Sequence, residues 1–230
     1  MKFGGLQKLT LLDYPDKVAA TVFTVGCNFR CPFCHNFSLV IGNKDKVEAI
    51  AQEEILQFLQ KRRNVLEGVC VTGGEPLIQP DIEDFLRKIR DMGYKIKLDT
   101  NGAFPDRLRS LIEQDLVDYV AMDVKNSKEA YSKTVGCIVD MGAIEESVAL
   151  LKSGVVDYEF RTTVTATFHT ESSIRAMAQW LQGAKRLYLQ QFVDSGDLLD
   201  STVVGADEQT LTKYCEIAKQ YVPNTQLRGI

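Results

Sequence analysis

The sequence predicts a single-domain α/β protein with a parallel sheet inside and helices outside, either a partial (β/α)6 barrel or an open doubly wound sheet. Six short apolar runs are rich in β-branched residues, which favours strands. Each run is followed by a stretch with apolar residues at helical spacing. Alternation of this kind gives a parallel sheet with covering helices, and six units fit a partial barrel or an open doubly wound sheet, since eight are needed to close a barrel.

The strands and helices follow from local patterns. Val18–Val25 (VAATVFTV) is typical of a buried strand, and the helix expected over 81–92 carries an apolar stripe and ends before Gly93. The expected strands are 18–25, 68–72, 95–100, 119–124, 158–165 and 186–192. The expected helices are 48–63, 81–92, 106–114, 143–152, 171–181 and 207–221.

Composition limits the classes of protein to consider. The 230 residues, 45% hydrophobic and 25% charged, suit one domain over 1–230 with a short N-terminal extension at 1–17. A net charge of −4 lacks the positive excess that is typical of proteins that bind nucleic acid. No apolar run approaches the roughly 20 residues that span a membrane. The start of the chain lacks a signal-peptide core, so a cytoplasmic location is expected. Six cysteines would be reduced there, which favours metal or catalytic roles over disulfides.

The loop at 26–36, GCNFRCPFCHN, carries the strongest chemical pattern. Cys27, Cys31 and Cys34 follow the first predicted strand with the spacing C-x3-C-x2-C. Thiolates are the preferred ligands of iron–sulfur clusters, and three of them leave the fourth iron of a 4Fe–4S cluster open to another ligand. The alternative is structural zinc with four protein ligands, in which His35 would have to reach the same metal as its neighbour Cys34.

Polar clusters follow the next strands, where the ligands of parallel sheets bind. Gly73 and Gly74 allow the backbone to approach a ligand closely, although a tight turn alone would also explain them. Asp99 and Asp123 each end an apolar strand, and a buried carboxylate is costly unless it is paired or metal-bound. Helix caps and turns are the alternative explanation for these residues and for Asn101.

The last two strands add further candidates. Arg161 lies inside an apolar run, and its guanidinium suits a carboxylate or a ribose hydroxyl unless it faces outward. One of Gln190 and Gln191 should point inward, because neighbouring strand residues face opposite ways, and Gln191 is favoured. His169 is expected in a surface loop. Structural roles are expected for Cys70, Cys137, Cys215 and Trp180.

The run CNFRCPFC at 27–34 resembles the cluster loop of radical S-adenosylmethionine (radical SAM) enzymes, and GGEP at 73–76 resembles a second motif of that family. The resemblance implies that S-adenosylmethionine chelates the open iron and that one electron from the cluster cleaves it. Methionine and a 5′-deoxyadenosyl radical would result. No side chain is then expected as a general base, and no catalytic residue beyond the cluster and the cofactor.

DTNG at 99–102 and D-x-K at 123–125 resemble motifs of glycyl-radical-enzyme activases. This resemblance implies a small monovalent cation at Asp99, Thr100 and Asp123, and a contact from Lys125 to the cofactor carboxylate. Phe33 would lie near the adenine, and the backbone of the glycines near the methionyl amine. The full expected set of cofactor-binding residues is Phe33, Asn36, Gly73, Gly74, Glu75, Asp99, Lys125, Arg161 and Gln191.

The segment Gly4–Pro15, together with MDVK and YEFRTTV further on, resembles the activating proteins of anaerobic ribonucleoside-triphosphate reductase. That resemblance implies a glycyl radical generated on a partner enzyme, most simply anaerobic ribonucleotide reductase, with flavodoxin or ferredoxin as the electron donor. The run CPFCHN at 31–36 also resembles pyruvate formate-lyase activase. A radical enzyme acting on a small molecule or a peptide, and a non-catalytic iron–sulfur or zinc protein, remain as alternatives.

Overall fold

One eight-stranded sheet organises the chain, and its strands lie side by side in sequence order from β1 to β8. The computed structural model describes residues 1–41, 49–194 and 196–229. The first strand pairs antiparallel with the second, and all later neighbours are parallel. The strands are β1 Phe3–Thr10, β2 Ala19–Thr24, β3 Gly68–Gly73, β4 Lys95–Thr100, β5 Tyr119–Asp123, β6 Asp157–Val164, β7 Leu187–Gln191 and β8 Thr225–Arg228.

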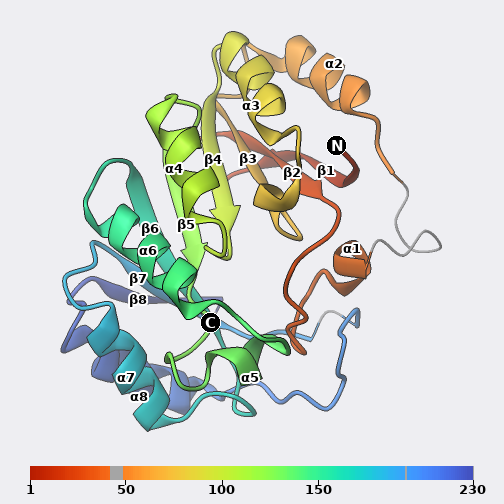
Figure 1. Cartoon of the computed structure of the whole chain (residues 1–230). Coiled ribbons are helices and arrows are strands. Elements are labelled where there is room, and N and C mark those ends of the chain that lie inside the picture. The colour runs from red at the N-terminus through yellow and green to blue at the C-terminus, as the bar shows by residue number, and fades with distance from the viewer. Residues whose placement is uncertain (42–48, 195, 230) are drawn as a thin grey trace.

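Figure 1 shows the long helices on the outside of the curved sheet, with the short α1 and α5 near its open side. The helices are α1 Phe37–Ile41, α2 Gln52–Arg62, α3 Ile82–Asp91, α4 Pro105–Glu113, α5 Tyr131–Val135, α6 Met141–Lys152, α7 Glu171–Trp180 and α8 Glu208–Lys219, with a 3-10 turn η1 at Pro76–Ile78. Among the described residues, none of these helices is long and apolar enough to cross a membrane.

The six predicted strands and their parallel order are confirmed, and so is the partial barrel. The predicted extension at 1–17 contains an edge strand, β1, that the sequence did not reveal. Helix α2 begins later than expected, and residue 48, where the prediction began, lies outside the described residues. Strand β8 and helices α1 and α5 were not predicted, because each has only four or five residues.

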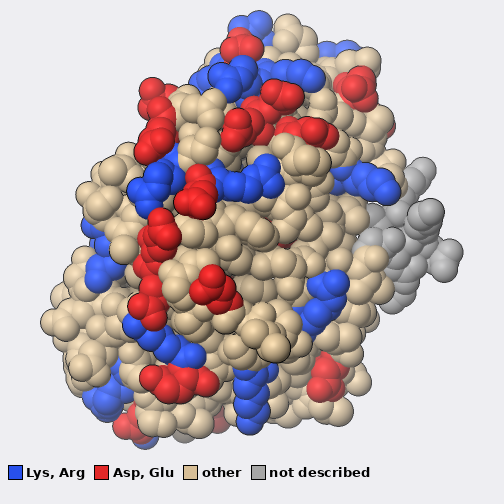
Figure 2. Space-filling view, viewed as in Figure 1, with Lys and Arg blue, Asp and Glu red and all other residues tan. Residues whose placement is uncertain are grey.

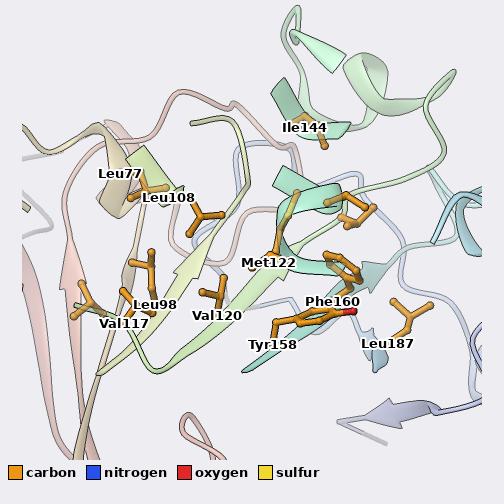
Figure 3. Close-up of a cluster of buried hydrophobic side chains, with 14 of the residues drawn as sticks. Leu77, Leu98, Leu108, Val117, Val120, Met122, Ile144, Tyr158, Phe160 and Leu187 are labelled. Atoms are coloured by element: carbon orange, nitrogen blue, oxygen red, sulfur yellow. The ribbon is translucent and has the colours of Figure 1, made fainter. Parts of the chain in front are cut away.

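Strand alternation separates an apolar outer face from a polar inner one. Val120, Met122 and Phe160 point outward and belong to the core beneath the helices (Figure 3). Their inward-facing neighbours include Lys97 and Glu159, which are buried inside the sheet's curve. The lumen of this partial barrel is therefore polar, and its carboxyl end opens onto the loops that follow the strands.

The outer surface carries both signs of charge. On the face seen in Figure 2, basic and acidic side chains are interspersed, and neither sign forms a continuous patch. This face therefore has mixed charge and shows no field of one sign that would steer a polyanion.

Candidate active site

The cysteine loop folds back across the end of β2 and is fastened at several points. Gly26 has a φ of +97°, and its N–H donates to the carbonyl of Leu39 at 2.8 Å. The backbone N–H of Arg30 donates to the Val135 carbonyl of α5 at 3.0 Å. The Arg30 guanidinium also donates to the carbonyl of Cys27 at 2.7 Å. These bonds hold the loop in a compact conformation with its thiols directed inward.

A cavity of about 260 Å³ lies beneath this loop, at the carboxyl ends of the strands. All three loop cysteines line it, and so do residues from five other strand ends or loops. The lining residues are Cys27, Phe29, Cys31, Phe33, Cys34, His35, Asn36, Val40, Thr72, Gly73, Gly74, Asp99, Thr100, Asn101, Asp123, Lys125, Arg161, Thr163 and Gln190. The structure therefore brings together the motifs that the sequence placed after separate strands.

Two glycines let the end of β3 approach the cysteine loop. Gly73 has a φ of +121°, which side chains rarely tolerate. A Cβ added to Gly74 would lie 1.9 Å from the carbonyl oxygen of Gly26. The N–H of Glu75 donates to that same oxygen at 2.8 Å. The glycines are thus required for backbone contact with the cysteine loop, and they also line the cavity.

Glu75 was expected to bind cofactor, but its side chain turns away from the cavity wall and is fully buried. Its carboxylate accepts hydrogen bonds from Leu77 N at 3.0 Å, Thr100 Oγ1 at 2.8 Å and Asn101 N at 2.7 Å. Burial raises the pKa of Glu75 to about 7, and these three donors act against that shift. Glu75 therefore braces the turn after β3 against the turn after β4.

The floor of the cavity is a row of alternating charges. Arg161 on β6 donates from Nη1 to Asp99 Oδ2 and from Nε to Asp123 Oδ1, both at 2.9 Å. Lys125 donates to Asp123 Oδ2 at 3.0 Å. Burial alone would raise the pKa of Asp123, but the charges of Arg161 and Lys125 outweigh it and lower that pKa to about 2. Burial likewise opposes ionisation of Asp99, but the charges of Arg161 and Lys97 outweigh it and lower that pKa, so both carboxylates are ionised.

Lys97, on β4 two residues before Asp99, extends this row of charges into the lumen of the barrel. It is 1% exposed and forms an ion pair with Asp99 Oδ1. Its Nζ also lies 3.8 Å from the thiol of Cys70, which is fully buried on the neighbouring strand β3, as its expected structural role requires. Lys97 was not among the predicted site residues, although its alternation with Asp99 could have revealed it.

The aromatic and amide residues form the remaining walls. Phe33 is buried and lies 5.8 Å from Phe168 between ring centroids. Asn101 Nδ2 donates to Asn28 Oδ1 at 2.8 Å and lies 3.8 Å from Cys27 Sγ. Asn36 lines the cavity at the start of α1, where its carbonyl accepts from Leu39 N at 3.0 Å.

The structure corrects two expectations. Gln190 rather than Gln191 lines the cavity, because Gln191 shares the outward face of β7 with Leu187 and Leu189. His169 is 2% exposed rather than at the surface. Its Nε2 lies 2.9 Å from the carbonyl of Lys125, so the ring supports the loop that carries this lysine. The burial of His169 could not be read from local sequence.

The cysteine thiols fit an iron–sulfur cluster. Burial raises the pKa of Cys27 to about 11 and that of Cys31 to about 12, so these thiols are protonated until a metal displaces the protons. Within the described ranges, no three His, Cys, Asp or Glu side chains are arranged to hold a single metal ion. A cluster does not require such convergence, because each thiolate binds a different iron. Cys27, Cys31 and Cys34 would hold three irons of such a cluster, and Gly73, Lys125 and Arg161 line the same cavity.

Known proteins place this architecture in a family. A family model described as the radical SAM superfamily matches residues 21–181. A Methanocaldococcus jannaschii protein, provisionally named a glycyl-radical enzyme activating enzyme, is 32% identical over 98% of this chain and 95% of its own length. An Aquifex aeolicus GTP 3′,8-cyclase is 28% identical over 87% of this chain and 65% of its own length.

Among solved structures, Streptococcus suis SuiB has the same fold, with a TM-score of 0.71 and 14% identity over 91% of this chain and 48% of SuiB. The family match covers the cysteine loop, the glycine turn and the charged floor, all of which meet at one cavity. The chain therefore belongs to the radical SAM superfamily of enzymes.

Proposed function

We propose that this protein is a radical SAM activating enzyme that generates a glycyl radical on a partner enzyme, with anaerobic ribonucleotide reductase as the favoured partner. One observation carries the proposal: three thiols of one loop, a two-glycine turn and two cations all face one cavity at the carboxyl end of the sheet. Such a cavity suits a cofactor with a soft sulfur centre, an amine and a carboxylate.

When bound, the 4Fe–4S cluster and S-adenosylmethionine supply the electron and the 5′-deoxyadenosyl radical that removes a hydrogen atom from glycine. The chain's own residues bind and orient them. The three cysteines would hold the cluster, and the Gly73–Gly74 backbone, which lines the same cavity, would receive the methionyl amine. Lys125 and Arg161 offer further N–H donors to a carboxylate. The Phe33 ring, which packs against Phe168, provides an apolar wall of the cavity for the adenine.

The activase reading is supported by the full-length similarity to the M. jannaschii protein and by the resemblance of the N-terminal segment to reductase activating proteins. The alternative partners are pyruvate formate-lyase or another glycyl radical enzyme. A radical enzyme acting on a small molecule or peptide is the second candidate, and the similarity to a GTP cyclase favours keeping it.

A reducing compartment suits this chemistry. All six cysteines are free thiols, and the cluster needs a low-potential donor, for which we propose flavodoxin or ferredoxin. We propose a cytoplasmic location for the same reason. We also propose that residues 1–230 form one domain, because the sheet that builds the cavity runs from β1 to β8.

The chemistry is tested by anaerobic reconstitution with iron and sulfide. The wild-type protein should bind a 4Fe–4S cluster and convert S-adenosylmethionine to 5′-deoxyadenosine under dithionite, and Cys31→Ala should lose both properties. Cys137→Ala is the matched control, because Cys137 lies near the cysteine loop, with its thiol 3.7 Å from the Asn28 carbonyl, but does not line the cavity. Zinc bound in place of iron would overturn the proposal.

The partner is tested by electron paramagnetic resonance. Reduced enzyme with S-adenosylmethionine is mixed with an anaerobic ribonucleotide reductase and, separately, with a pyruvate formate-lyase. A glycyl-radical doublet on the reductase supports the favoured partner, and one on the lyase supports the alternative. Consumption of a metabolite with no protein radical would favour the small-molecule reading.

A further inference from the structure

The three residues expected to hold a monovalent cation already have their polar atoms occupied by the protein. Asp99 Oδ1 is paired with Lys97, and Asp99 Oδ2 with Arg161. Asp123 Oδ1 is paired with Arg161, and Asp123 Oδ2 with Lys125. Each of the four carboxylate oxygens thus accepts a charge-assisted hydrogen bond from a side chain of this chain.

The third expected ligand is also engaged. Thr100 Oγ1 donates to Glu75 Oε1 at 2.8 Å and accepts from Gly102 N at 3.1 Å. Thr100 is 3% exposed, and its hydroxyl is held in the brace between the two turns. It therefore has little freedom to turn toward an ion between Asp99 and Asp123.

The charge balance points the same way. Lys97, Arg161 and Lys125 bring three positive charges to the two carboxylates, which leaves one positive charge in excess. Lys97 is 1% exposed, and its ammonium group forms an ion pair with the Asp99 carboxylate. A further cation would have to displace one of these three cationic side chains from its carboxylate in a largely buried site, whereas the carboxylate of a ligand would be attracted to them.

We propose that Lys97 and Arg161 take the place of a bound monovalent cation, so that Arg161 and Lys125 receive the carboxylate of the cofactor directly. The residues Asp99, Thr100 and Asp123 then do not form a cation site, contrary to the expectation from sequence. Lys97 is a positioning residue: it neutralises Asp99 from below and leaves the other side of the Arg161 guanidinium for the ligand. The proposal rests on the proposed function only in taking S-adenosylmethionine as that ligand.

The first test uses the wild-type reconstituted enzyme without reductant. Binding of S-adenosylmethionine is measured in sodium, potassium and choline chloride at equal ionic strength, and melting of the cluster-free protein is followed in the same salts. The proposal expects the dissociation constant to change by less than about twofold, a difference of ~0.4 kcal/mol. It also expects no specific rise in melting temperature with sodium or potassium. Binding that fails in choline and returns with either ion would overturn it.

The second test removes the Lys97 charge, so that an added cation could take its place beside Asp99. Lys97→Met keeps the length of the side chain but removes its charge, so Asp99 loses one cationic partner. In choline this variant should bind S-adenosylmethionine about tenfold more weakly, and ammonium or potassium should restore most of the loss, which a purely structural defect would not allow. Lys95→Met is the matched control, because Lys95 is exposed and pairs with Asp118 outside the cavity.

A Lys97→Met protein that folds, binds normally in choline and ignores added cations would contradict the proposal. If this variant does not fold, the wild-type salt series decides alone. Both experiments read binding rather than radical transfer, so they stand even if no glycyl-radical partner is found. Failure of the proposed function is therefore distinguishable from failure of this inference.

Discussion

The two ends of the barrel lumen are both polar and both hollow, yet only one has the chemistry of an active site. The carboxyl end holds the cavity of about 260 Å³ beneath the cysteine loop. The opposite end holds a larger one, of about 720 Å³, lined by side chains that include Tyr14, Tyr119, Arg186 and Arg228. Size and charge therefore do not distinguish them.

The difference lies in how the charged groups are satisfied. At the larger cavity, Arg228 forms a two-pronged pair with Glu159 at 2.7 and 2.9 Å, and the Tyr119 hydroxyl donates to the same carboxylate. Lys95 and Arg90 share Asp118 in the same way. At the cysteine end, three thiols line the cavity beside the charged floor, whereas no cysteine is among the residues that line the opposite cavity. What marks the active site is a set of potential ligand-binding groups, here the thiols, that the fold does not use for its own ion pairs.

The largest effect is expected from adding a side chain at Gly74, where the turn after β3 contacts the backbone of the cysteine loop. In Gly74→Ala the new Cβ would overlap the Gly26 carbonyl, so the turn and the cysteine loop must separate. We expect a loss of about 3 kcal/mol in unfolding free energy and loss of cluster binding, measured by denaturant melts and iron content. Gly154→Ala is the control: its φ is +78° but its Cβ would meet open space, so it should cost only about 1–2 kcal/mol and retain the cluster.

An intermediate effect is expected from exchanging arginine for lysine at each end. The ammonium group introduced by Arg161→Lys would carry its charge on one nitrogen and would lack the planar fork with which Arg161 donates to Asp99 and Asp123 from separate nitrogens. Affinity for S-adenosylmethionine should fall about tenfold in equilibrium binding to the reconstituted enzyme. Arg228→Lys, at the opposite end, should lower stability without changing that affinity. Equal losses from both variants would mean that the two ends are not independent.

The smallest effect concerns acid stability at the end without cysteines. Burial alone would raise the pKa of Asp118, but hydrogen bonds from Arg90 and Lys95 outweigh it and lower that pKa below its ordinary 3.8. Its contribution is therefore present above pH 3.8 and is lost as the pH falls through the lower folded-state value. Asp118→Asn should cost about 1 kcal/mol at neutral pH and reduce the acid-induced loss in melts recorded below pH 3.8. Cofactor affinity at neutral pH should not change.

The sequence was most informative where a pattern repeats. Buried strands such as β5 are continuous apolar runs, and their parallel order follows from the helices between them. Strand β1 was missed because it is an edge strand that contains Gly4 and Gly5 and exposes Leu9, which hides its alternation.

The site could be predicted as a set of strand ends, but the partner of each side chain could not. Alternation showed that only one of Gln190 and Gln191 faces inward, but Gln191 was favoured, and Lys97 was not selected although it alternates with Asp99. The turning of Glu75 onto Asn101 N depends on how two loops meet, and no local rule contains that contact. Tertiary contacts between turns therefore decide which polar residues bind a ligand and which support the fold.

The guanidinium of Arg161 has a mechanical consequence. It reaches from β6 to carboxylates on β4 and β5, so it fastens three adjacent strands across their backbone ladder. Sliding of any one strand would break an ion pair in a largely buried setting, which is costly. The base of the cavity should thus be rigid. Any conformational change that accompanies binding of a ligand or partner must then occur in the loops that follow the strands.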